Sequence, residues 1–258
     1  NYKLHPDKLE NSYFDYEWRS DNKLPITVFH KVEERDSCMR LTVQLTAAQD
    51  VYFNYRQLLS TGYRHDNCQF YMPGFWYRRN LRSPKKAPSF HTSDSWLVRE
   101  DRLSAPLTGI FSEKEKRFMT VNRLDDFSMD ALATHKEGEI ILSGKTSLGF
   151  TGFENQQGIA MLSFGFPYRE APKSYIRKLT LAPEVEAFQL MKKGESVLLT
   201  WEIMESGADD FSDFIQHTWE HCYDTYAPKP VENSYSIADM KQVLSCFFVN
   251  SLFDNQPL

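Results

Sequence analysis

The stretch MRLTVQL, residues 39–45, alternates apolar and polar side chains at every position. Successive side chains of an extended strand point to opposite faces, so this alternation predicts a strand with one buried face and one solvated face. Other stretches have strand character and are mostly bounded by Gly, Pro, Asn or Asp: residues 26–32, 51–58, 95–103, 117–124, 139–142, 159–166, 185–190 and 197–204. Parallel sheets need crossover helices between their strands, and residues 26–204 have little helical pattern. The sequence therefore predicts a mainly β fold, a large antiparallel β-sandwich.

A helical pattern replaces the strand pattern after residue 208. Its apolar residues recur at helical spacing: Phe211, Phe214, Ile215, Trp219, Cys222 and Tyr226. The acidic pair Asp209 and Asp210 suits the positive end of a helix, and Pro228 and Pro230 cannot continue one. This segment is predicted to be a helix that links the sandwich to the C-terminal part of the chain.

A second helix is predicted close to the C-terminal end of the chain. The tetrapeptide SIAD at residues 236–239 resembles a capping box with Asp in place of Glu or Gln. A broad apolar stripe extends over residues 237–252, which one helix cannot bury by itself. Such a helix folds back on the sandwich, pairs between chains, or is the first helix of a helical domain. We therefore predict three parts: a β-sandwich domain over residues 1–205, a linker helix and proline linker over residues 206–230, and the first helix of a helical domain over residues 231–258.

Composition restricts the classes of function. The 258 residues are 41% hydrophobic and 25% charged, which is enough to form a large core. The net charge of −5 and the lack of a long basic run argue against a nucleic-acid partner. No apolar run approaches the length of about 20 residues that a membrane-spanning helix needs. The four cysteines form no C-x-x-C pair, and most of them are interpreted as buried thiols.

Two neighbouring stretches combine aromatic, arginine and carboxylate side chains, FYMPGFWYRRN at residues 70–80 and DSWLVREDR at residues 94–102. Aromatic rings stack on the C–H faces of a pyranose, and planar polar groups recognise its hydroxyls. The candidate carbohydrate-binding residues are Trp76, Arg78, Arg79, Asp94, Trp96, Arg99, Glu100 and Arg102. In an extended strand, Glu100 and Arg102 would share one face and Arg99 and Asp101 the other. The alternative is a structural network of ion pairs that fixes a long loop on the sheet.

Four segments together carry a family resemblance: PGFWYRRN at 73–80, DSWLVREDRLSAP at 94–106, FPYRE at 166–170, and the predicted helix at 209–226. With them, the chain resembles the N-terminal β-supersandwich, of the galactose-mutarotase-like type, found in glucoamylase-like and glycoside-phosphorylase-like glycosidases. In that group a helical (α/α)-toroid domain comes next and carries the catalytic carboxylates.

The resemblance implies a non-catalytic, substrate-shaping module of a glycoside hydrolase, with its general acid and base beyond Leu258. The implied partners are an oligo- or polysaccharide and a C-terminal helical catalytic domain of the same parent chain. A bacterial protein of the periplasm or cell surface is the expected source and location. No catalytic residue of the family is carried onto this sequence.

Other functions fit parts of the sequence. A stand-alone carbohydrate-binding module would use the same aromatic and charged residues. A mutarotase-like activity would need a histidine base and a carboxylic acid facing one sugar, for which His65 and His91 are available.

The stretch HTWEH, residues 217–221, matches H-x-x-E-H, in which His217 and His221 could bind zinc and Glu220 could act as a base. The motif lies on the predicted linker helix, and zinc peptidases that use it take a further ligand from far downstream. A solvated helix flank is the alternative explanation, so we predict no metal or other cofactor.

Overall fold

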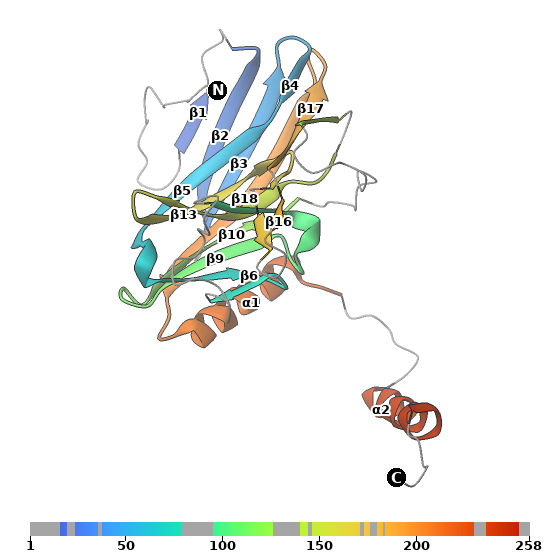
Figure 1. Cartoon of the computed structure of the whole chain (residues 1–258). Coiled ribbons are helices and arrows are strands. Elements are labelled where there is room, and N and C mark those ends of the chain that lie inside the picture. Colours follow the sequence, from blue (N-terminus) through green and yellow to red (C-terminus); the bar gives the residue numbers. More distant parts are fainter. Residues whose placement is uncertain are drawn as a thin grey trace. The chain divides into compact units, whose positions relative to one another are not determined.

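The structure is a computed structural model, which describes residues 16–19, 24–35, 38–78, 95–125, 140–143, 146–170, 173–175, 180–182, 184–229 and 236–252. The chain forms two compact units, Asn1–Thr218 and Trp219–Leu258. The first unit contains all the described strands (Figure 1). It is mainly β and its sheets are largely antiparallel, which confirms the predicted fold class.

Two sheets form the main sandwich. The large sheet has eight strands, in the order β1 (Tyr16–Arg19), β2 (Ile26–Arg35), β3 (Cys38–Ala47), β18 (Ser196–Gly207), β10 (Arg117–Arg123), β9 (Leu107–Ser112), β6 (Cys68–Met72) and β7 (Trp76–Arg78). The sheet that we call the middle sheet has the order β5 (Tyr55–Arg64), β13 (Ile159–Phe166), β12 (Phe150–Gln156) and β8 (Ser95–Arg99). Every pairing in these two sheets is antiparallel.

A third sheet and a short hairpin complete the described strands. The third sheet has the order β11 (Ile140–Ser143), β17 (Val185–Met191) and β14 (Arg169–Glu170), and β4 (Val51–Phe53) also pairs with β17. The pairing of β11 with β17 is parallel. The hairpin consists of β15 (Lys173–Tyr175) and β16 (Thr180–Ala182).

The two faces of the middle sheet contact different cores. One face packs against the large sheet and contributes Val98, Phe153 and Phe164 to the main core. The opposite face contributes Leu97 and Phe150 to a second core cluster that includes Val185 and Ala187 of β17. Side-chain alternation along β8 and β12 produces this division. The middle sheet is therefore covered on both sides over part of its area.

Each stretch predicted to be a strand contains one, but several strands were missed. In β9, LTGIFS, all six residues are buried, and in β12 the first five of seven are buried. Strands that are covered on both faces lack the apolar–polar alternation by which half-buried strands are recognised. The expectation of one strand over residues 95–103 was wrong beyond Arg99, where Glu100–Arg102 form a 3-10 helix, η2.

Helix α1 (Phe211–Tyr226) confirms the helix predicted after residue 208, and its role as a linker between domains stays a prediction. The carboxylate of Asp210 accepts hydrogen bonds from the backbone N–H groups of Ser212 and Asp213, at 2.7 and 3.0 Å, and caps the start of the helix. These backbone bonds lower the pKa of Asp210. The beginning of α1 lies beside β6 and β9 of the large sheet (Figure 1).

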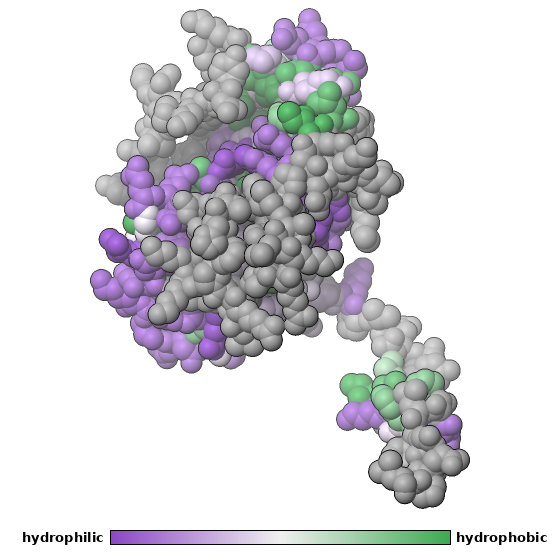
Figure 2. Space-filling view, in the orientation of Figure 1, coloured by the Kyte–Doolittle hydropathy of each residue, from purple (hydrophilic) through white to green (hydrophobic). Residues whose placement is uncertain are grey.

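Helix α2 (Ile237–Phe247) belongs to the second unit and continues into a π-helical turn, η3 (Phe248–Leu252). The predicted capping box is present, because Ser236 Oγ accepts from the N–H of Asp239 and the Asp239 carboxylate accepts from the N–H of Ser236. The apolar side chains of α2 and η3 are exposed (Figure 2): Ile237, Met240, Val243, Leu244, Phe247, Phe248 and Val249. Among the described helices, none combines the length and the hydrophobicity needed to cross a bilayer.

Candidate functional site

The face of the middle sheet that points away from the main core carries a cluster of polar and small residues. Arg56 lies on β5, Ser163 and Gly165 on β13, and Gly152 and Glu154 on β12. Their chain neighbours Tyr55, Phe153, Leu162 and Phe164 pack in or against the main core, and alternation places the cluster on the other side. We call this surface the fork face.

An ion pair between Arg56 and Glu154 crosses the fork face. Nη2 of Arg56 donates to both carboxylate oxygens of Glu154 at 2.5 Å, and Nε donates to Ser163 Oγ at 3.4 Å. The Glu154 side chain is 8% exposed, whereas that of Arg56 is 31% exposed. Strand β13 lies between β5 and β12, and its small residues leave room for the two long side chains to meet over it. The pair is therefore a planar set of donors and acceptors in which Arg56 is partly exposed, while Glu154 and Ser163 are buried.

Further ion pairs gather where β8 ends. Arg99 forms a bidentate ion pair with Asp101, in which Nε donates to Oδ1 at 2.8 Å and Nη2 donates to Oδ2 at 2.6 Å. The guanidinium of Arg99 lies 5.1 Å from the ring centre of Tyr168. Arg102 Nε lies 2.7 Å from a carboxylate oxygen of Glu170. The change from strand to 3-10 helix at Glu100 directs consecutive charged side chains to separate partners.

Glu100 is buried and lies between the large sheet and the middle sheet. Its Oε2 accepts from Arg123 Nη1 at 2.6 Å and from the N–H of Gly149 at 2.8 Å. Arg123 also donates to Asp125 Oδ2 at 3.1 Å and to the carbonyl of Ser147 at 3.0 Å. Burial raises the pKa of Glu100, and the charge of Arg123 opposes this rise. The pair joins β10 to the end of β8.

The aromatic members of the predicted binding set pack against each other. Trp76 is 4% exposed, and its ring centre lies 4.9 Å from that of the half-buried Trp96. Arg78 has a left-handed backbone, with φ at 57°, and its guanidinium lies 5.2 Å from the ring centre of Phe211. A ring buried to this extent offers no open face for a sugar to stack on.

The six predicted site residues that the structure describes do not gather at one place. Trp76 and Trp96 meet in the main core, Arg78 contacts α1, and three residues at the end of β8 bind separate carboxylates or Arg123. Arg79 and Asp94 lie outside the described residues. The geometry of Arg99, Glu100 and Arg102 matches the alternative interpretation, an ion-pair network. Carbohydrate binding by the set stays a prediction, and the sequence interpretation missed Arg56 and Ser163.

Of the two histidines considered for mutarotase-like chemistry, the structure describes only one. His65 is buried, with its ring centre 5.1 Å from that of Phe70, and His91 lies outside the described residues. A third histidine, His30 on β2, has Nε2 3.1 Å from the hydroxyl of Tyr55, which donates to Gln57 Oε1 at 3.0 Å. Burial lowers the pKa of His30 to about 4, so its imidazole is neutral at pH 7.

His30 is therefore expected to titrate with a midpoint of about 4 in the folded protein, which an NMR titration of its ring nitrogens measures. The unfolded chain, with an ordinary histidine pKa of about 6.5, binds more protons between these two values. The stability that His30 contributes is therefore present above pH 6.5 and is lost as the pH falls towards 4. Replacement of His30 by Gln should remove this part of the pH dependence. A measured midpoint near 6.5 would contradict the expectation.

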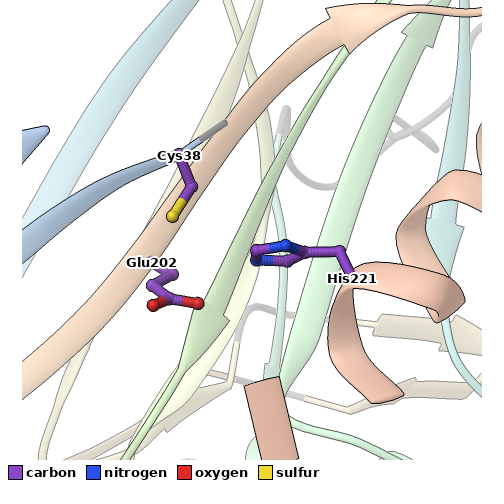
Figure 3. Close-up of side chains that lie close together, drawn as sticks. All are labelled: Cys38, Glu202 and His221. Atoms are coloured by element: carbon purple, nitrogen blue, oxygen red, sulfur yellow. The ribbon is translucent and has the colours of Figure 1, made fainter. Parts of the chain in front are cut away.

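A second polar cluster lies on the face of the large sheet opposite the main core. Cys38 on β3 and Glu202 on β18 share this face, and Figure 3 shows their side chains. Nη2 of Arg40 donates to Glu202 Oε1 at 2.6 Å. The buried carboxylate therefore has a cationic partner within the sheet.

The two histidines of the H-x-x-E-H match have partners on their own helix. Nε2 of His217 lies 3.4 Å from Asp213 Oδ1, and Nε2 of His221 lies 3.4 Å from Thr225 Oγ1. All four residues belong to α1, one helical turn apart within each pair. Zinc binding by His217 and His221 stays an untested alternative.

Comparison with known proteins gives similarity in fold only. No protein-family model and no curated protein sequence matches the chain. Among solved structures, a protein of Escherichia coli K12 proposed to be an aldose 1-epimerase is 8% identical, with a TM-score of 0.44, over 77% of this chain and 67% of its own. A galactose mutarotase-like protein of Clostridium acetobutylicum is 8% identical, with a TM-score of 0.40, over 75% of this chain and 62% of its own.

A larger enzyme is also similar. A GH36 α-galactosidase of Geobacillus stearothermophilus is 12% identical, with a TM-score of 0.42, over 80% of this chain and 26% of its own. The chain thus spans about a quarter of the length of that enzyme. Mutarotase-like proteins and glycosidases are the classes that the sequence resemblance names.

Proposed function

We propose that the chain is a carbohydrate-contacting β-sandwich module of a carbohydrate-active enzyme, located in the periplasm or at the cell surface. It shapes the substrate site and does not supply the catalytic groups. The observation that carries the proposal is the pair of Arg56 and Glu154 with Ser163 on the fork face, in which the Arg56 side chain is partly exposed. Planar guanidinium and carboxylate groups bind hydroxyls directionally, which is what recognition of a sugar requires.

The pairing of the nearby carboxylates supports the non-catalytic role. Glu154, Asp101 and Glu170 each form an ion pair with an arginine. A glycosidase needs two carboxyl groups that face one glycosidic bond from opposite sides. Here each of these carboxylates faces an arginine instead, which suits a binding surface better than an acid and nucleophile pair.

The exposed apolar side chains of α2 support the proposed helical partner domain. A helix whose apolar stripe is open to water gains stability when another surface covers it. The second unit exposes such a stripe, which includes Met240, Leu244 and Phe247. A C-terminal helical catalytic domain of the same parent chain would cover it.

Neutral sugars are expected to bind the purified chain weakly, with a dissociation constant of about 1 mM, equivalent to roughly −4 kcal/mol. Titration with D-galactose, D-glucose and maltose, monitored by ¹H–¹⁵N NMR, measures this. The absence of any perturbation by all three sugars would refute the proposal. Polarimetry tests the mutarotase alternative by measuring the rate at which α-D-galactose anomerises. The chain should not raise this rate above that in buffer. Acceleration would favour the epimerase function over the non-catalytic module.

A further inference from the structure

The ion pair of Arg56 and Glu154 has a donor and acceptor oxygens that can take further hydrogen bonds. Arg56 uses Nη2 for the carboxylate and Nε for Ser163, and in the part of the chain that the structure describes its Nη1 makes no hydrogen bond. Two other paired arginines near the middle sheet are more enclosed, since Arg123 is 4% and Arg99 is 11% exposed, whereas Arg102 at the end of β8 is 41% exposed. At 31% exposure, the Arg56 side chain is partly open to solutes.

The charge of the pair indicates the kind of ligand. An unpaired guanidinium would favour a phosphate or a uronate, but Glu154 neutralises Arg56. The carboxylate oxygens can still accept from hydroxyls, and Nη1 can donate to a hydroxyl oxygen. Two adjacent hydroxyls of one ring supply both kinds of group, each donating to Glu154 or accepting from Arg56. An uncharged polyhydroxyl ring fits this pair better than an anion.

Three positions of the sheet beside the pair carry small residues, Gly152, Ser163 and Gly165, while Met161 pairs in register with Glu154. A Cβ at Gly152 would lie 1.9 Å from the carbonyl oxygen of Trp96, and one at Gly165 would lie 2.1 Å from that of Tyr55. These close approaches of backbone exclude every larger residue at both positions. Ser163 precedes Gly165 on β13 by two positions and pairs in register with Gly152 on β12. On β12 and β13, therefore, no long side chain stands beside the pair at these positions.

We propose that Arg56, Glu154 and Ser163 form a subsite for an uncharged pyranose, bound through two adjacent hydroxyls that bridge the guanidinium and the carboxylate. The subsite deepens the proposed function and rests on it. It places sugar contact on the fork face, at residues outside the set predicted from the sequence. Ser163 orients the guanidinium through its contact with Nε.

The test compares three variants with the wild type in the same sugar titrations. Arg56→Lys keeps the charge but lacks the planar fork, and Glu154→Gln keeps the shape but removes the ionised acceptor. Arg117→Lys is the matched control, because Arg117 and Glu205 form another cross-strand pair, at 2.9 Å between β10 and β18. Binding of D-galactose or D-glucose should weaken about tenfold or more in the first two variants and stay unchanged in the control.

The outcomes separate the two proposals. If the wild type binds none of the sugars, the proposed function fails. If the wild type binds a sugar, and Arg56→Lys and Glu154→Gln bind it as tightly as the wild type does, the proposed subsite is wrong while the proposed function stands. Should a variant not fold, the wild-type NMR titration decides, because the amides of Ser163 and Gly165 should shift with sugar. Shifts confined to other strands would overturn the subsite.

Discussion

Replacing Arg123 with methionine is expected to lower the free energy of unfolding by about 3 to 5 kcal/mol, because removal of one partner leaves a buried charge uncompensated. Glu100 is 1% exposed and keeps only the N–H of Gly149 as a donor to Oε2 in the described surroundings. Arg123 also holds Asp125, which accepts in turn from the N–H of Thr200 on β18. The change therefore removes a link between the large sheet and the middle sheet. Urea denaturation of both proteins measures the loss.

The loss should depend on pH in a defined direction. Burial raises the pKa of Glu100 above its ordinary value, and Arg123 is the main group that opposes the rise. In the variant this pKa rises further, so the folded state binds a proton more readily than the unfolded state does. Stability then falls as the pH rises above the unfolded value of about 4.3. The destabilisation by Arg123→Met should thus be larger at pH 7.5 than at pH 5.

Two controls distinguish this mechanism from a general effect of losing an arginine. Adding Glu100→Gln to Arg123→Met should recover part of the lost stability, since the uncompensated charge is then gone. Arg117→Met removes the arginine of an exposed pair and should change the unfolding midpoint little. A double variant no more stable than Arg123→Met would show that the carboxylate is not the source of the loss.

The local parts of the fold could be predicted from the sequence, since they depend on neighbouring residues. The alternation in residues 39–45 places β3 correctly, and the pattern at residues 236–239 forms the capping box. Strands β9 and β12 could not be found in this way, because both of their faces are covered and their sequences do not alternate. Their positions depend on which other strands pack over them.

The candidate site was missed for a related reason. Arg56 and Glu154 are 98 residues apart, and neither has a local sequence pattern that marks it. They meet because β13 pairs with both β5 and β12, which is a property of topology. The sequence predicted binding residues within 94–102 because charged side chains are adjacent there in the sequence. The end of β8 at Arg99 separates those charges in space.

Replacing Phe214 with alanine is expected to lower the free energy of unfolding by about 3 to 5 kcal/mol, the range for a large buried aromatic residue. Phe214 is fully buried at the start of α1, and four aromatic rings surround it within 6.1 Å, those of Tyr71, Phe111, Phe118 and Phe211. Alanine would leave a cavity that these rings cannot fill without moving. Urea denaturation gives the overall loss, and hydrogen exchange of residues 211–218 shows whether the helix is released first.

A coupled substitution tests whether Phe214 is what holds α1 on the large sheet. A Cβ at Gly109 on β9 would lie 2.6 Å from Cζ of Phe214 and 3.0 Å from Cγ2 of Thr120. Gly109→Ala should therefore destabilise the wild type by pushing on the Phe214 ring. In the Phe214→Ala background most of that clash is absent, so the same substitution should cost clearly less. Strictly additive losses would mean that Phe214 does not occupy the space above Gly109, and that the packing of the helix depends on other contacts.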